Sequence, residues 1–97
     1  MKYNLPERVL RDISLFAKKY SVAKVILFGS RARGNNTERS DVDIIVYGGD
    51  FDSFYWEVKE NMHSLLTFDV IEGDKGISEE LKEEIDRDGA VIYEKAR

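Results

Sequence analysis

Hydrophobic positions recur at helical spacing near the start of the chain and then form a short β-branched run. In residues 6–20 the apolar side chains fall on one side of a helix, with Pro6 early and Lys18 and Lys19 near the end, so this segment predicts an amphipathic helix. Residues 23–28 predict a buried strand that ends in a tight turn, because their apolar run stops at a glycine and a serine.

The second half of the chain continues this alternation of patterns. Residues 41–47 are rich in β-branched side chains and are followed by two glycines, which predicts a second strand. Residues from about 52 to 63 carry apolar side chains on one side of a helical wheel and predict a helix. Residues 65–71 then predict a third strand.

The C-terminal part predicts one more helix and one more strand. Ser78 can cap a very acidic helix whose apolar stripe is thin, and Gly89 is a suitable terminator. Residues 90–93 predict the fourth strand. We therefore predict one α/β domain over residues 1–97, with a small mixed sheet of about four strands flanked by helices.

Composition and charge narrow the class of protein. The chain has 97 residues, of which 42% are hydrophobic, and this length supports one modest core, so we expect any second domain to come from another chain. No apolar run approaches the roughly 20 residues of a membrane span, no secretory signal is evident, and we expect a cytoplasmic protein. The absence of cysteine excludes disulfides, thiolate zinc sites and cysteine nucleophiles. A net charge of −4 disfavours direct binding of nucleic acid.

Two carboxylates stand two residues apart at the start of the second predicted strand. The two-residue period of a strand sends the side chains of Asp41 and Asp43 to the same face, with their Cα atoms about 7 Å apart. Half-burying two negative charges side by side is unfavourable unless a cation lies between them, and Mg²⁺ takes oxygen ligands of this kind. The pair indicates a divalent-cation site, whereas an exposed strand edge would leave both residues in water.

A glycine-containing turn precedes these acids. Gly29 lets backbone N–H groups approach a ligand closely, and a short helix after Ser30 would point amides and the Ser30 hydroxyl at a phosphate. Arg31 and Arg33 could add positive charge there, but a plain turn would leave both arginines in solvent. The segment is not a P-loop, because it lacks the G-x-x-x-x-G-K-[ST] pattern.

A third acid, Asp69, lies inside an otherwise apolar predicted strand, and such a placement is costly without a partner. If this strand lies beside the one that carries Asp41 and Asp43, three carboxylates converge, which is enough for one or two Mg²⁺ ions and a base. On an edge strand Asp69 would instead face water.

The ordered combination of these motifs resembles the nucleotidyltransferase fold of the DNA polymerase β superfamily, and most of all its minimal nucleotidyltransferase (MNT) proteins. The motifs are residues 29–34 (GSRARG), residues 40–44 (SDVDI) and Asp69 on a later strand. The resemblance covers nearly the whole chain, and the three-part pattern is specific in a way that no single part is.

The resemblance implies transfer of a nucleoside monophosphate from ATP or another NTP to a hydroxyl, with release of pyrophosphate. By this likeness Gly29 and Ser30 would hold the triphosphate, and Asp41 and Asp43 would ligate Mg²⁺. Asp69 would complete a second metal site or help to deprotonate the acceptor. Two such ions can stabilise both the attacking and the leaving oxygen of an in-line displacement.

The same family resemblance implies a partner. MNT proteins of this size are similar to the antitoxin halves of modules whose toxin is a helical HEPN ribonuclease, and in that family the antitoxin can attach AMP to a toxin tyrosine. Two alternatives remain open at this point. One is a non-catalytic binding module that neutralises its partner by occlusion, and the other is a small-molecule nucleotidyltransferase of the aminoglycoside type. The acidic helix could meet a basic partner, or it could simply be a solvated face.

Overall fold

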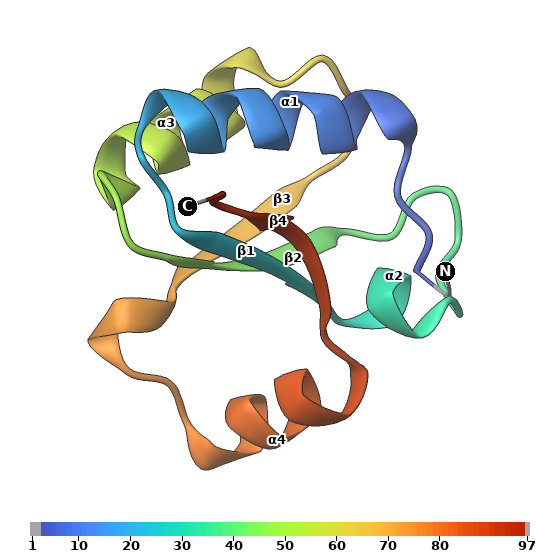
Figure 1. Ribbon diagram of the computed structural model, residues 1–97. Coiled ribbons are helices and arrows are strands. Elements are labelled where there is room, and N and C mark those ends of the chain that lie inside the picture. Colours follow the sequence, from blue (N-terminus) through green and yellow to red (C-terminus); the bar gives the residue numbers. More distant parts are fainter. Residues whose placement is uncertain (1–2, 97) are drawn as a thin grey trace.

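A four-stranded mixed sheet forms the centre of the molecule, with helices on both of its faces (Figure 1). The computed structural model describes residues 3–96. The strand order is β3-β2-β1-β4, in which β1 (Lys24–Phe28) runs antiparallel to β2 (Val42–Tyr47) and to β4 (Ala90–Glu94). Only β3 (Phe68–Glu72) is parallel to its neighbour, β2. The predicted α/β class and four-stranded mixed sheet are confirmed.

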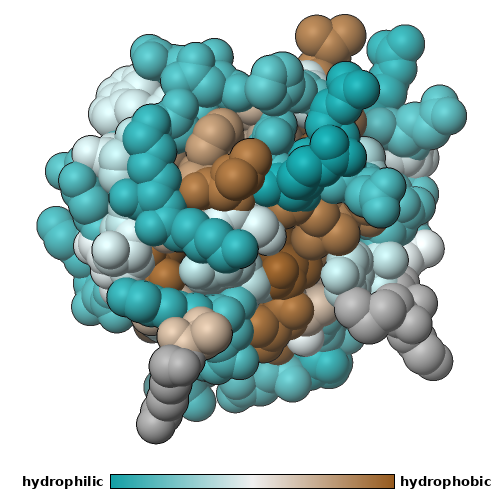
Figure 2. Space-filling view, turned by 45° about the horizontal axis from the view of Figure 1, so that its top comes forward, coloured by the Kyte–Doolittle hydropathy of each residue, from teal (hydrophilic) through white to brown (hydrophobic). Residues whose placement is uncertain are grey.

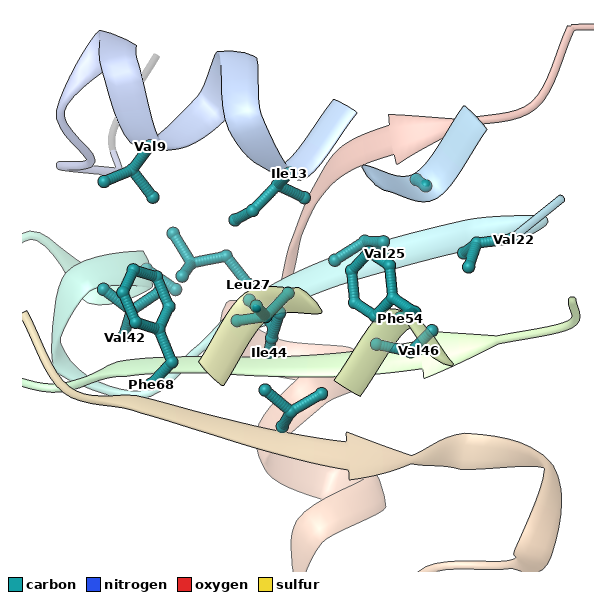
Figure 3. Packing of buried hydrophobic residues seen from close by; sticks show 14 residues of the cluster. Val9, Ile13, Val22, Val25, Leu27, Val42, Ile44, Val46, Phe54 and Phe68 are labelled. Atoms are coloured by element: carbon teal, nitrogen blue, oxygen red, sulfur yellow. The ribbon is translucent and has the colours of Figure 1, made fainter. Parts of the chain in front are cut away.

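One face of the sheet is covered by α1 (Glu7–Lys19) and α3 (Phe51–Asn61), as Figure 1 shows. Every second residue of the strands points to this face, because strand side chains alternate between faces. Figure 3 shows the resulting core, which includes Val9, Ile13, Val22, Val25, Leu27, Val42, Ile44, Val46, Phe54 and Phe68. These side chains are almost entirely buried, so this face supplies most of the hydrophobic stabilisation.

The opposite face is covered by α4 (Glu79–Asp88), which lies below the sheet in Figure 1. Ser78 caps α4 as predicted, because its hydroxyl accepts a hydrogen bond from the backbone N–H of Leu81 at 3.1 Å. No residue of α4 is fully buried. The cover on this side of the sheet is therefore partial, and polar residues of the strands can remain within reach of solvent.

Two short elements lie at the ends of strands. Directly after β1 comes the single turn α2 (Ser30–Arg33), which is the short helix expected after Ser30. The 3-10 turn η1 (Gly73–Lys75) follows β3, and it places Gly73 so close to the ring of Tyr47 that an added Cβ would require the ring to move. None of the helices within residues 3–96 has the length and apolar character needed to cross a membrane.

The predicted third strand begins too early. Residues 65–67 are not in a strand, and Leu65 is completely exposed. The chain bends here because the backbone N–H of Leu66 donates to the hydroxyl of Ser64 at 3.1 Å, and the backbone N–H of His63 donates to Asp12 at 3.0 Å. The helix predicted up to residue 63 ends at Asn61 for the same reason.

Candidate active site

The pairing of three strands brings the predicted acids to one end of the sheet, on the face that carries α4. The parallel register of β2 and β3 sets Asp43 opposite Asp69. Asp41 lies immediately before β2, where its charge acts on Asp43. On the other side of β2, Asp43 is opposite Phe28, the last residue of β1, and Gly29 follows at once. The glycine turn and the acids are therefore neighbours across strands.

Gly29 is required by its contact with Asp43. Its φ of 76° lies in the left-handed region that L side chains rarely adopt. A Cβ at this position would also collide with the Oδ2 atom of Asp43. The glycine thus lets the backbone that leads into α2 lie directly against the carboxylate, which brings the Ser30 segment next to the acids.

The acids at this end of the sheet influence one another electrostatically. Burial, together with the negative charges of Asp69 and Asp41, raises the pKa of Asp43 to about 6. Glu84 on α4 adds to the rise, while Arg33 on α2 opposes it. A carboxylate that resists ionisation beside two others is a site where a bound cation would relieve repulsion.

The residues at this site fit a hard divalent cation by their chemistry. Asp41, Asp43 and Asp69 offer only carboxylate oxygens, which are the ligands that Mg²⁺ prefers. Within residues 3–96, however, no three acidic or histidine side chains already stand in the arrangement of a metal-binding group. Binding of an ion would therefore require these side chains to turn toward one another.

Arg31 has a different position from the one we predicted. Its side chain is only 3% exposed, and its guanidinium donates to the carbonyl oxygens of Ser40 at 3.0 Å, Glu38 at 3.0 Å and Asn4 at 3.3 Å. These bonds fasten the loop that leads into β2. Arg31 therefore holds the backbone just before Asp41, and its donors are not available to a phosphate.

Arg33 lies beside the acids. Its Nη1 atom is 3.4 Å from the Oε2 atom of Glu84, and both side chains are roughly one-third exposed. Since Arg33 opposes the rise in the pKa of Asp43, its positive charge acts on the carboxylate site. Glu84 was not singled out from the sequence, where it is one of several acids on a helix with a thin apolar stripe.

The chain's one histidine and one tryptophan lie on or beside the helices that cover the other face of the sheet. The Nδ1 atom of His63 is 3.0 Å from Oδ2 of Asp12. Burial opposes ionisation of Asp12, but the hydrogen bonds from the backbone and ring of His63 outweigh it, and the pKa of Asp12 falls below its usual value. Trp56 lies on the outer side of α3 and is 58% exposed. His63 therefore has a structural role, because it joins the segment after α3 to α1.

The sheet, the helices around it and the row of acids at one end together define a nucleotidyltransferase fold. The chain belongs to the polymerase β nucleotidyltransferase family, whose pattern matches residues 12–97. This stretch includes Gly29, Ser30 and all three acids.

Known relatives and structures agree with this family. Two proteins of Methanocaldococcus jannaschii, each named "Putative protein adenylyltransferase", are 44% identical over 50 residues and 38% identical over 68 residues. These matches span 47% and 66% of this chain, and 50% and 62% of the two relatives. The chain thus aligns with only about half to two-thirds of the relatives' length.

Among solved structures, a toxin–antitoxin crystallised with AMP-PNP superimposes with a TM-score of 0.68 at 21% identity. The superposition covers 89% of this chain and 73% of the other. At this level of identity the likeness confirms the fold.

Proposed function

We propose that this protein is a Mg²⁺-dependent adenylyltransferase that transfers AMP from ATP to a hydroxyl of a partner protein. The observation that carries the proposal is that Asp43 of β2 lies opposite Asp69 of β3 and against the backbone of Gly29, which directly follows β1. Two relatives carry the name of a protein adenylyltransferase, and a structural neighbour was crystallised with an ATP analogue. We further propose that the partner is a HEPN ribonuclease toxin, that the acceptor is a tyrosine, and that the protein acts as the antitoxin in the cytoplasm.

The proposal gives each residue of the site a role. The backbone at Gly29 and the hydroxyl of Ser30 would hold the triphosphate, and Arg33 would face its negative charge. Asp41 and Asp43 would hold the Mg²⁺, and Asp69 would either complete a second metal site or help to deprotonate the acceptor. The cation, when bound, supplies charge neutralisation for an in-line displacement. Catalysis would then consist mostly of positioning and electrostatic stabilisation.

Transfer of AMP would form one bond to the α-phosphorus and break another. The acceptor oxygen forms a bond to the α-phosphorus, the bond from that phosphorus to the bridging oxygen breaks, and pyrophosphate leaves with the bonding electrons. Asp69 is exposed on the edge strand and lies next to Asp43, so it can take the proton of an approaching hydroxyl. The acceptor would reach Asp69 from the open edge of the sheet.

Intact-mass spectrometry of the partner tests this proposal. The product of the adjacent gene, as the candidate partner, is incubated with the protein, ATP and Mg²⁺, and the Asp41→Ala/Asp43→Ala variant serves as the control. We expect a gain of one or more AMP units that the variant does not produce. A stable complex in both samples without any gain in mass would contradict transfer and favour neutralisation by occlusion. AMP transfer to an aminoglycoside but not to the protein would favour the small-molecule alternative.

A further inference from the structure

An ion pair connects two elements that meet beside the acids. Arg33 ends α2, and Glu84 lies in the middle of α4, which is 51 residues further along the chain. Their side chains approach to 3.4 Å on the face of the sheet that carries Asp43. The contact is thus long-range in sequence and local to the candidate site.

Both members of the pair lie near Asp43. Arg33 belongs to the helical turn capped by Gly29, whose backbone lies against the Asp43 carboxylate, and Glu84 contacts Arg33. Other ion pairs involving α4, such as Lys82 with Asp86, join residues of that helix and are more exposed. The pair between Arg33 and Glu84 is therefore placed to affect the chemistry of the site.

The geometry of the pair leaves most of the arginine free. Glu84 contacts only Nη1 of Arg33, whereas a guanidinium carries five N–H donors in a rigid plane. A long arginine side chain loses considerable rotamer freedom when it binds a phosphate. A carboxylate that already fixes one nitrogen removes part of that cost, as carboxylates do for metal-bound histidines.

We infer that Glu84 is a positioning residue that holds Arg33 beside the acids, so that its remaining N–H donors face the β- and γ-phosphates of a bound nucleoside triphosphate. This inference rests on the proposed function, because it takes the α-phosphorus to lie at the carboxylates. The other phosphates then extend toward the Ser30 turn and α2. Glu84 itself touches no substrate.

Equilibrium binding of ATP and of AMP, each with Mg²⁺, tests the inference on the full chain. We expect Glu84→Ala to weaken ATP binding by about 3- to 10-fold while changing AMP binding by less than about 2-fold. Glu84→Gln should recover part of the loss, because the amide oxygen can still accept from Arg33. The matched control is Glu83→Gln on the same helix, which is exposed and should bind both nucleotides as the wild type does.

A double-mutant cycle separates positioning from simple charge repulsion. In the background of Arg33→Met, Glu84→Ala should no longer weaken ATP binding. If Glu84 acted only by repelling the triphosphate, both Glu84 variants would bind ATP more tightly than the wild type, and the inference would be wrong. If the wild type binds ATP and Glu84→Ala binds it equally well, the inference is wrong but the proposed function still stands. Failure of the wild type to bind ATP at all would overturn the proposed function together with it.

Discussion

The two faces of the sheet differ most clearly along β2. Toward α1 and α3 the strand presents Val42, Ile44 and Val46, each at most 1% exposed. Toward α4 it presents Asp43, Ile45 and Tyr47, of which only Ile45 is fully buried. Both sets come from a single six-residue strand, so its alternation alone assigns one face to stability and the other to a half-buried carboxylate.

The two faces also differ in where neighbouring carboxylates lie. Under α1 and α3 the strands contribute a continuous set of buried apolar side chains. The face under α4 contains three acids near one another, and one of them has a raised pKa. The surface around the core is largely hydrophilic in Figure 2, with hydrophobic residues visible between polar ones. The acids are therefore concentrated at one end of the face under α4, which we call the weakly covered face because no residue of α4 is fully buried.

The largest loss of stability is expected on the apolar face. Phe54 of α3 is fully buried, so Phe54→Ala should lower the free energy of unfolding by about 3–5 kcal/mol. Trp56 on the same helix is 58% exposed, and Trp56→Ala should cost less than about 1 kcal/mol. Urea denaturation measures both values. Equal losses for the two variants would contradict the assignment of this face as the main source of stability.

Arg31 holds the loop that leads into β2, and its substitution should cause the next-largest loss of stability. Arg31→Lys removes the planar set of donors to the carbonyl oxygens of Ser40, Glu38 and Asn4, and we expect a loss of about 2–3 kcal/mol. Arg33→Lys serves as the control and should cost less than about 1 kcal/mol, since its pair with Glu84 is partly exposed. A chemical denaturation series that ranks the two variants in the reverse order would contradict the buried role of Arg31.

The contrast between these arginines shows what the sequence could provide and what it could not. Successive residues of a helix are rotated by about 100° around its axis. Two residues two positions apart are therefore rotated by about 200° and point to nearly opposite sides. Arg31 and Arg33 therefore cannot both face a phosphate from one helical turn. The sequence did predict the turn, but the carbonyl oxygens that bind Arg31 come from loop residues whose backbone path no local pattern specifies.

For the three acids, too, one part of the site could be predicted from the sequence and another part depends on the fold. The sequence alone shows that Asp41 and Asp43 lie two residues apart where the second strand begins. The pairing of Asp43 with Asp69 depends on β3 lying parallel to β2, which is a matter of topology and was only a condition in the sequence argument. The early start predicted for the third strand was wrong because a serine side chain bends the backbone at Leu65 and Leu66. Glu84 was missed since its partner is 51 residues away.

Gly29→Ala should destabilise the weakly covered face where the Gly29 backbone lies against the Asp43 carboxylate. The added Cβ meets the carboxylate of Asp43, and the positive φ adds backbone strain, so we expect a loss of about 1–3 kcal/mol. Binding of ATP should be lost as well, because the backbone near Ser30 must move. Gly76→Ala is a useful comparison, since that glycine also has a positive φ but has open space around it. Equal nucleotide binding by both variants would contradict the role of Gly29.

Asp43→Asn should stabilise the protein in the absence of divalent cations. The folded pKa of about 6 exceeds the ordinary 3.8, so the folded state binds more protons in that window, and wild-type stability falls as the pH rises through it. The variant does not titrate and should exceed the wild type by about 1–2 kcal/mol above pH 6, after allowance for solvent screening. The difference should vanish below about pH 4. Thermal melts with EDTA at both ends of the window measure it, with Asp52→Asn as an exposed control.

Paramagnetic broadening by Mn²⁺ tests most directly whether the cation and nucleotide bind on the weakly covered face. Amide signals of the ¹⁵N-labelled protein are recorded while Mn²⁺ is added in the presence of ATP. Our account predicts that signals of Gly29, Ser30, Asp43 and Asp69 broaden first, while those of α1 and α3 persist, and that Asp41→Ala/Asp43→Ala abolishes the selectivity. Selective broadening centred on α1 or α3, or no selective broadening at all, would contradict the account.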